Sequence, residues 1–197
     1  MKSLAARWTV PAVLIAVVGL APRTAVLAQD VPLTLEAVAV SLGDVERVAG
    51  TAQVTVRIDR WSTDEDRAKL KDAVTEKGDG ALLSALQRIK PVGKISTTGS
   101  LGWDIHYAHQ VALASGARRI VFATDRPMSF WERTRGARSR DYEYLLGEVR
   151  VGPDGKGEGK LVARANVTYD SEGRTLTIEN YDTQPIRLTN VRLTPKK

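Results

Sequence analysis

Apolar and polar residues alternate along most of the chain, which is the pattern of β-strands with one face buried and the other in water. The segment "VTVRIDRW" shows this clearly. Val54, Val56 and Ile58 would lie on one face, whereas Thr55 and Arg57 would lie on the other. Successive side chains of a strand point to opposite faces of its sheet. We therefore expect a half-buried strand here.

The same period recurs along the chain. It predicts further strands at about 33–42, 92–97, 103–113, 117–124, 142–151, 160–170, 174–181 and 186–193. The segments "PDGKGEG" (153–159) and "DSEGR" (170–174) lie between strands and are rich in Gly, Pro and Asp, which supply the backbone angles of turns. The region from about 142 to 193 is therefore predicted to form a four-stranded meander.

One region follows a helical period instead. In "STDEDRAKLKDAVTEKG", Ser62 is followed three residues later by Glu65, the pattern of a capping box at a helix N-terminus. Leucines at helical spacing predict a second helix at about 80–90, and Pro91 ends it. We expect a helical hairpin at about 62–90.

These elements predict an α+β, β-rich fold. We expect an antiparallel sandwich or partly closed barrel of about eight strands, with the helical hairpin at 62–90 as an insertion that caps one end. Residues 29–197 are long enough to form a single domain with its own core.

The N-terminal segment has a different character. Lys2 and Arg7 precede the apolar run "WTVPAVLIAVVGLA" (8–21), and Val26 and Ala28 suit the −3 and −1 positions of a cleavage after Ala28. These features are typical of a secretory signal peptide, and the run is shorter than the roughly 20 apolar residues of a transmembrane helix. We expect this segment to direct export to the periplasm or the medium. Its retention as a membrane anchor is the alternative.

Charge and composition reduce the number of possible functional classes. The chain has 29 basic and 23 acidic residues, and the signal peptide holds three of the basic ones, so the mature domain has 26 basic residues against 23 acidic ones and a net charge of +3. So small a charge does not favour nucleic-acid binding, and no nucleic-acid partner is expected. The absence of cysteine excludes disulfides, thiol nucleophiles and zinc–thiolate sites.

Both histidines lie in "GWDIHYAHQ" (102–110), within a predicted strand. His109 would share a face with the apolar residues, and His106 would lie on the opposite face with Asp104. One strand then cannot bring both imidazoles to a single ion, so no metal site is predicted. Asp104 and His106 carry the alternative hypothesis, a hydrolase-type enzyme, but no nucleophile accompanies them and no catalytic residue is assigned.

No cofactor motif is present. The segment "GPDGKGEGK" (152–160) lacks the Ser or Thr of a phosphate-binding loop and the acidic spacing of a calcium loop. "TGSLG" (98–102) lacks the first glycine of the serine-hydrolase motif. We expect a plain hairpin turn and no cofactor.

Arginines concentrate in "FWERTRGARSRDYEY" (130–144), next to aromatic residues. Guanidinium groups bind phosphate and carboxylate, and aromatic rings stack on flat ligands or sit at lipid interfaces. The candidate ligand-binding residues are Trp131, Arg133, Arg135, Arg138 and Arg140. An anionic lipid or polysaccharide of the cell envelope would suit them. The alternative is a solvated loop whose aromatic rings pack into the core.

Four segments resemble a family of secreted bacterial proteins described as hypothetical. They are "ERVAGTAQVTVRIDRWSTDEDRAKL", "SLGWDIHYAHQ", "RRIVFATDRPMSFWE" and "DGKGEGK". The resemblance covers most of the mature chain and implies export and a bacterial source, but no activity or site residues. We therefore expect an exported, non-catalytic binding or envelope-associated module.

Overall fold

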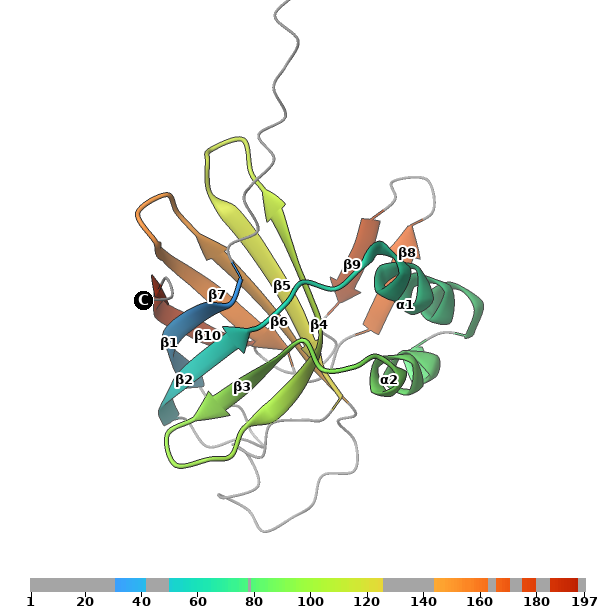
Figure 1. The fold of residues 1–197 in the computed structure, drawn as a ribbon, viewed down its shortest axis with the longest axis horizontal. Helices are drawn as coiled ribbons and strands as arrows, with labels where there is room; N and C mark the ends of the chain where they lie inside the picture. The colour runs from blue at the N-terminus through green and yellow to red at the C-terminus, as the bar shows by residue number, and fades with distance from the viewer. Residues whose placement is uncertain are drawn as a thin grey trace, which may run out of the picture.

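The computed structural model describes residues 31–41, 50–77, 79–125, 144–162, 166–170, 175–179 and 185–194 (Figure 1). Eight antiparallel strands close into a barrel in the order β1–β10–β7–β6–β5–β4–β3–β2. The strands are β1 (Leu33–Ser41), β2 (Gly50–Ile58), β3 (Gly93–Thr97), β4 (Trp103–Ala112), β5 (Arg118–Thr124), β6 (Leu145–Val151), β7 (Lys156–Val162) and β10 (Ile186–Thr194). The predicted β-rich α+β fold is confirmed, and the barrel is closed.

The barrel interior is filled by the apolar residues that alternate along the strands. Leu35 of β1 lies opposite Val56 of β2, which lies opposite Ile95 of β3, and each is at most 2% exposed. Burying a side chain of this size stabilises the fold by about 1.5–3 kcal/mol. The predicted face of Val54, Val56 and Ile58 is therefore confirmed as the inner one.

The ring of one buried phenylalanine packs over a glycine on the neighbouring strand. Phe122 of β5 lies opposite Gly147 of β6, and both face the interior. A Cβ atom added at Gly147 would overlap the Phe122 ring. Phe122 is 1% exposed, so its ring fills the space that a side chain at position 147 would otherwise occupy.

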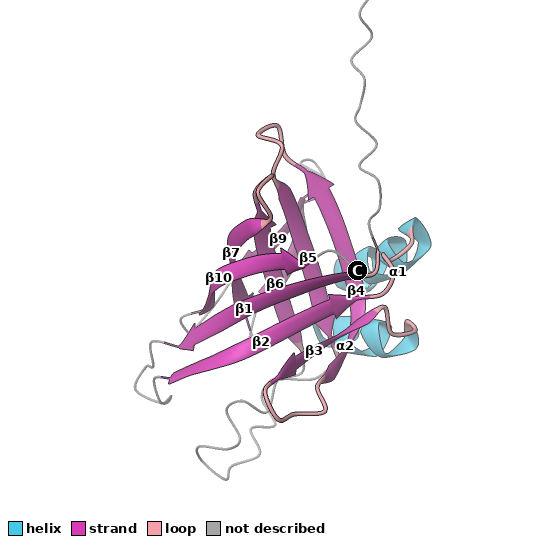
Figure 2. Ribbon diagram, turned by 60° about the vertical axis from the view of Figure 1, so that its left-hand side comes forward, coloured by secondary structure: helices cyan, strands magenta, loops and turns pink. Residues whose placement is uncertain are grey.

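Helices α1 (Asp64–Lys77) and α2 (Asp79–Arg88) lie on the outside of the barrel (Figures 1 and 2). Their apolar side chains form a second core cluster with residues on the outside of the barrel. The hairpin contributes Leu70, Val74, Leu82, Leu86 and Ile89, and the barrel side contributes Ala123 and Tyr144. The hairpin thus packs against the wall rather than over an end of the barrel, because β4, β5 and β6 are apolar on their outer side there. Neither described helix has the length and apolar character needed to span a membrane.

The capping box of α1 lies one residue later than predicted. The amide of Asp66 donates to the hydroxyl of Thr63, and the amide of Thr63 donates to the carboxylate of Asp66, each over 3.1 Å. Ser62 is occupied elsewhere: its hydroxyl accepts from the amide of Ala108 at 3.0 Å, and its own amide donates to the carbonyl of Ala108 at 2.9 Å. The chain therefore runs beside β4 before α1 begins.

The C-terminal third is not the predicted four-stranded meander. β7 pairs with β6 and β10, while β8 (Asn166–Asp170) and β9 (Thr175–Glu179) form a separate two-stranded sheet. The predicted turn at 153–159 is also too long. Gly157 and Gly159 belong to β7, where an added Cβ would overlap the backbone of β6. These glycines allow the two strands to approach closely, and only Gly155, with φ 75°, serves the turn between β6 and β7.

We predict that Gly147→Ala lowers the free energy of unfolding by about 1–3 kcal/mol, because the new methyl group displaces the Phe122 ring. Urea unfolding measures the change. Gly50→Ala is the matched control, since no atom lies within 4 Å of a Cβ there, and its effect should stay within about 0.5 kcal/mol. Equal stability of the two variants would contradict the packing described.

Candidate functional site

β4 contains a bulge that reverses its faces. Ile105 pairs with Thr124, but Tyr107 already pairs with Ala123, so His106 is an extra residue in the ladder. Beyond the bulge Ala108 faces the barrel core, and Tyr107 packs against the helical cluster. The prediction that His109 shares a face with the inward apolar residues of this strand is therefore wrong, because the alternation shifts after Ile105.

Both histidines lie on the helix side of the barrel, because His106 alternates with the buried Ile105 and the bulge moves His109 to the same face. The prediction of opposite faces is therefore wrong. His106 contacts the end of the helical hairpin, and His109 lies near Asp64 and Arg67 of α1. Within the described residues, however, no three His, Asp or Glu side chains are grouped closely enough to hold a metal ion.

His106 joins three parts of the molecule. Its Nδ1 lies 2.6 Å from the carbonyl oxygen of Ile89, and because a carbonyl can only accept, Nδ1 carries the proton. Its Nε2 lies 3.6 Å from Oδ1 of Asp125, an ion-pair distance when the ring carries both protons. The His106 side chain is only 9% exposed. The ring therefore links β4 to the end of α2 and to the end of β5.

Asp104, the predicted partner of His106, is engaged elsewhere. Its carboxylate lies 3.8 Å from the ammonium of Lys94, and its side chain is half exposed. Asp104 and His106 share no hydrogen bond or ion pair in the structure. The acidic neighbour of His106 is Asp125, which is distant in sequence from the histidines and carries no motif that would have identified it.

His109 and Tyr107 face the N-terminal turns of α1. Burial lowers the pKa of His109, with the positive charge of Arg67 acting in the same direction. Burial raises the pKa of the Tyr107 hydroxyl, and the Arg67 charge opposes that shift. Both side chains are therefore favoured in their neutral forms.

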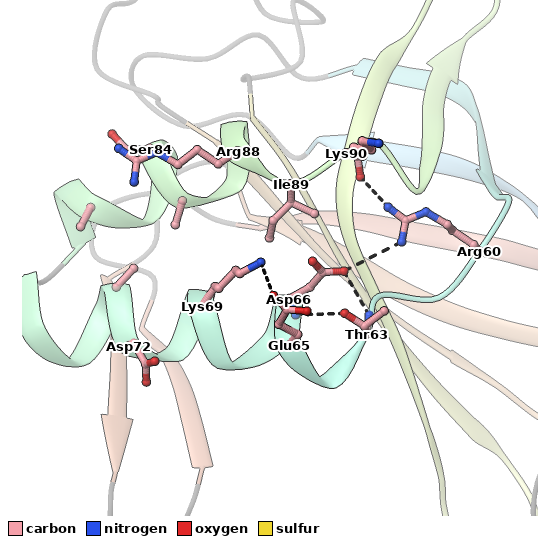
Figure 3. Close-up of a pocket in the computed structure, with 13 residues that line it drawn as sticks. Arg60, Thr63, Glu65, Asp66, Lys69, Asp72, Ser84, Arg88, Ile89 and Lys90 are labelled. Carbon is pink, nitrogen blue, oxygen red and sulfur yellow. Dashed lines mark hydrogen bonds and ion pairs between the residues drawn. The ribbon is translucent and has the colours of Figure 1, made fainter.

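A groove of about 970 Å³ lies between α1, α2 and the segments that join the helices to the barrel (Figure 3). Its lining includes Ala73 of α1 and Ala81 and Ala85 of α2, whose small side chains leave room between the helices. Ile89 also lines it, so the residue that anchors His106 through its carbonyl borders the groove with its side chain.

The charges of the groove are divided between its two sides. α1 contributes the acids Glu65, Asp66 and Asp72 and one cation, Lys69, while the opposite side contributes only cations. These cations are Arg60, Arg88 and Lys90. Opposite charges on facing sides give the groove a dipolar character.

Several of these charges are already in contact (Figure 3). Lys69 lies 2.8 Å from Glu65, and both side chains are more than half exposed. Arg60 donates to the carbonyl of Lys90 at 2.9 Å and lies 3.9 Å from Asp66. An exposed pair such as Lys69–Glu65 is worth at most about 1 kcal/mol, so a ligand can displace it. Sequence reasoning did not find these residues, since they come from separate segments with no shared spacing.

The predicted ligand-binding residues Trp131, Arg133, Arg135, Arg138 and Arg140 lie outside the described residues. The structure does locate the two described residues that flank their segment. Asp125 contacts His106, and Tyr144 packs in the helical cluster, so both flanking residues are on the helix side of the barrel.

Comparison with protein-family models, curated proteins and solved structures finds no match to this chain.

The lowered pKa of His109 predicts a pH dependence of stability. The unfolded chain binds the proton at the ordinary value of 6.5, more tightly than the folded chain does. Stability should therefore fall as the pH drops through that value towards the lower folded-state pKa. His109→Gln should lose less stability than the wild type between pH 7.5 and pH 5.5, about one unit on either side of the histidine pKa. Thermal unfolding at both pH values measures this, and a variant with the same loss as the wild type would contradict it.

Proposed function

We propose that the protein is an exported, non-catalytic binding module of the bacterial envelope, and that the groove between α1, α2 and the barrel is its ligand site. The observation that carries this proposal is the division of charge described above, with acids on the α1 side, cations on the other side and alanines between them. Support for export comes from the basic, apolar and small-residue pattern of the N-terminal segment.

The arrangement suits a small ligand that bears one positive and one negative group. An ammonium group would replace Lys69 beside Glu65, and a carboxylate would meet Arg60. The guanidinium of Arg60 has five N–H donors and uses one of them on the Lys90 carbonyl. A short aliphatic part of the ligand would lie on the alanine side chains. A dipeptide has these three features.

The contacts of His106 favour binding over the hydrolase alternative. Its Nδ1 is committed to the Ile89 carbonyl, its ring is nearly buried, and the carboxylate that faces it is Asp125 rather than Asp104. A general base has to reach the proton that it removes, directly or through one water molecule. A ring held between two elements of the fold is better suited to a structural role.

The test is a titration with the dipeptide alanyl-alanine, followed by amide NMR shifts. We expect saturable shifts at Glu65, Lys69 and Arg88 with a Kd of about 1 mM, which corresponds to about 4 kcal/mol. Acetylating the amine or amidating the carboxylate of the probe should each weaken binding about two- to fivefold, because each removes one exposed ion pair.

Arg60→Gln should weaken alanyl-alanine binding by a similar factor. Arg57→Gln is the matched control, because Arg57 is exposed, pairs with Asp59 and does not line the groove. If groove amides do not shift at about 10 mM probe, well above the expected Kd, or if both blocked probes bind as well as the free dipeptide, the proposed site is wrong.

A further inference from the structure

One wall of the barrel, formed by β5, β6, β7 and β10, places cations directly opposite one another. Three such pairs lie in register across neighbouring strands: Arg119 with Arg150, Lys160 with Arg187, and Lys156 with Arg192. Side chains directly opposite on one face of an antiparallel pair have Cβ atoms about 4.5–5.5 Å apart, and like charges there are destabilising. These like-charge contacts lie on β5–β6 and β7–β10. Across β6 and β7 the register instead places Glu148 opposite Lys160 and Glu158 opposite Arg150, and Glu36 of β1 lies opposite Arg192.

These side chains point away from the barrel interior. Along β6, Val149 and Val151 are buried in the core, and Arg150 between them is exposed. Along β7, Leu161 is buried and Lys160 is exposed. In both views β7 and β10 lie on the side of the barrel away from the helical hairpin (Figures 1 and 2). We call the outward face of β5, β6, β7 and β10 the basic wall.

The acids of the basic wall do not neutralise it. Glu148 lies 3.1 Å from Arg150 and 3.9 Å from Lys160, so one carboxylate serves two cations. The other acid, Glu158, forms no ion pair within the described part of the chain. Four of the six cations also form no ion pair with a described residue: Arg119, Lys156, Arg187 and Arg192. The basic wall thus holds six cations and two acids, a net charge of +4, whereas the whole mature domain is expected to carry +3.

We propose that the basic wall docks a linear polyanionic polysaccharide. The polymer's carboxylates would lie between the facing cations and turn three repulsive pairs into attractive contacts, with release of counterions. Neighbouring strands are about 4.7–4.9 Å apart, so the facing cations of β7 and β10, Lys160 with Arg187 and Lys156 with Arg192, lie within reach of neighbouring carboxylates of one flexible chain. This inference rests on the envelope location in the proposed function and is independent of the groove.

A lipid bilayer is the less suitable partner for this wall. Proteins at a lipid interface bury apolar side chains in it, and the exposed large apolar residues of the described chain, Leu101 and Val111, lie outside β5, β6, β7 and β10. A barrel wall is also convex, so a flat surface would meet few of the cations at once. A polymer can bend to reach them all.

The test compares two double variants that remove the same charge. Lys160→Gln with Arg187→Gln neutralises one facing pair of the basic wall. Arg57→Gln with Lys94→Gln neutralises a facing pair on β2 and β3, elsewhere on the barrel. The probe is polygalacturonate, titrated at several salt concentrations, with phosphatidylglycerol vesicles as the second probe.

We expect wild-type binding to polygalacturonate to weaken steeply with salt. The basic-wall variant should bind about five- to tenfold more weakly, because two exposed charge contacts are lost, whereas the β2–β3 variant should change about twofold or less. Thermal stability of the basic-wall variant should be unchanged or raised, since a repulsive pair is removed. Absence of polymer binding at low salt, equal weakening in both variants, or binding to vesicles alone would overturn the proposal.

Discussion

The hydrogen bond from the Nδ1–H of His106 to the carbonyl oxygen of Ile89, 2.6 Å long and buried, ties the helical hairpin to the barrel. His106 alternates with the buried Ile105 and so faces the helix side, and the bulge that follows brings Tyr107 to the same side. Leaving a buried donor or acceptor without its partner costs about 1–3 kcal/mol. The end of α2 is therefore fixed at a defined place on the barrel wall, and the position of the groove follows from it.

The two sides of the barrel present different outer surfaces. On the helix side, outward apolar residues of β4, β5 and β6 are covered, and the two helices leave a groove of mixed charge between them. On the side of β7 and β10 the outward residues are charged and exposed, and cations face one another in register. The closed, packed interior supports both surfaces without taking part in either. The two binding surfaces that we propose lie on one barrel, an arrangement suited to a module that recognises a small ligand while attached to a polymer.

Much of the fold was predictable because alternation and helical spacing are local properties of the sequence. Val54, Val56 and Ile58 were assigned to one face correctly, strands were predicted around Leu35 and Ile95, and the hairpin at 62–90 was found. The failures have physical causes. The bulge shifts the alternation of β4 by one residue. Nothing in the sequence marks it, because Tyr107 and Ala108 are each compatible with either face of a strand. Ser62 fits the sequence pattern of a helix cap, but its hydroxyl instead accepts a hydrogen bond from the backbone amide of Ala108. The groove and Asp125 could not be predicted, because they depend on segments brought together only by folding.

If His106 anchors the helical hairpin to the barrel, its removal should loosen α2 first, and amide hydrogen exchange in His106→Ala measures this. We expect amides of α2 to exchange at least about tenfold faster than in the wild type, which corresponds to about 1.4 kcal/mol, while β6 and β7 keep their protection. Asp104→Ala, which removes an exposed carboxylate of the same strand, should leave α2 unchanged. Unaltered exchange of α2 in His106→Ala, or an equal loss of protection throughout the barrel, would show that His106 does not anchor the hairpin.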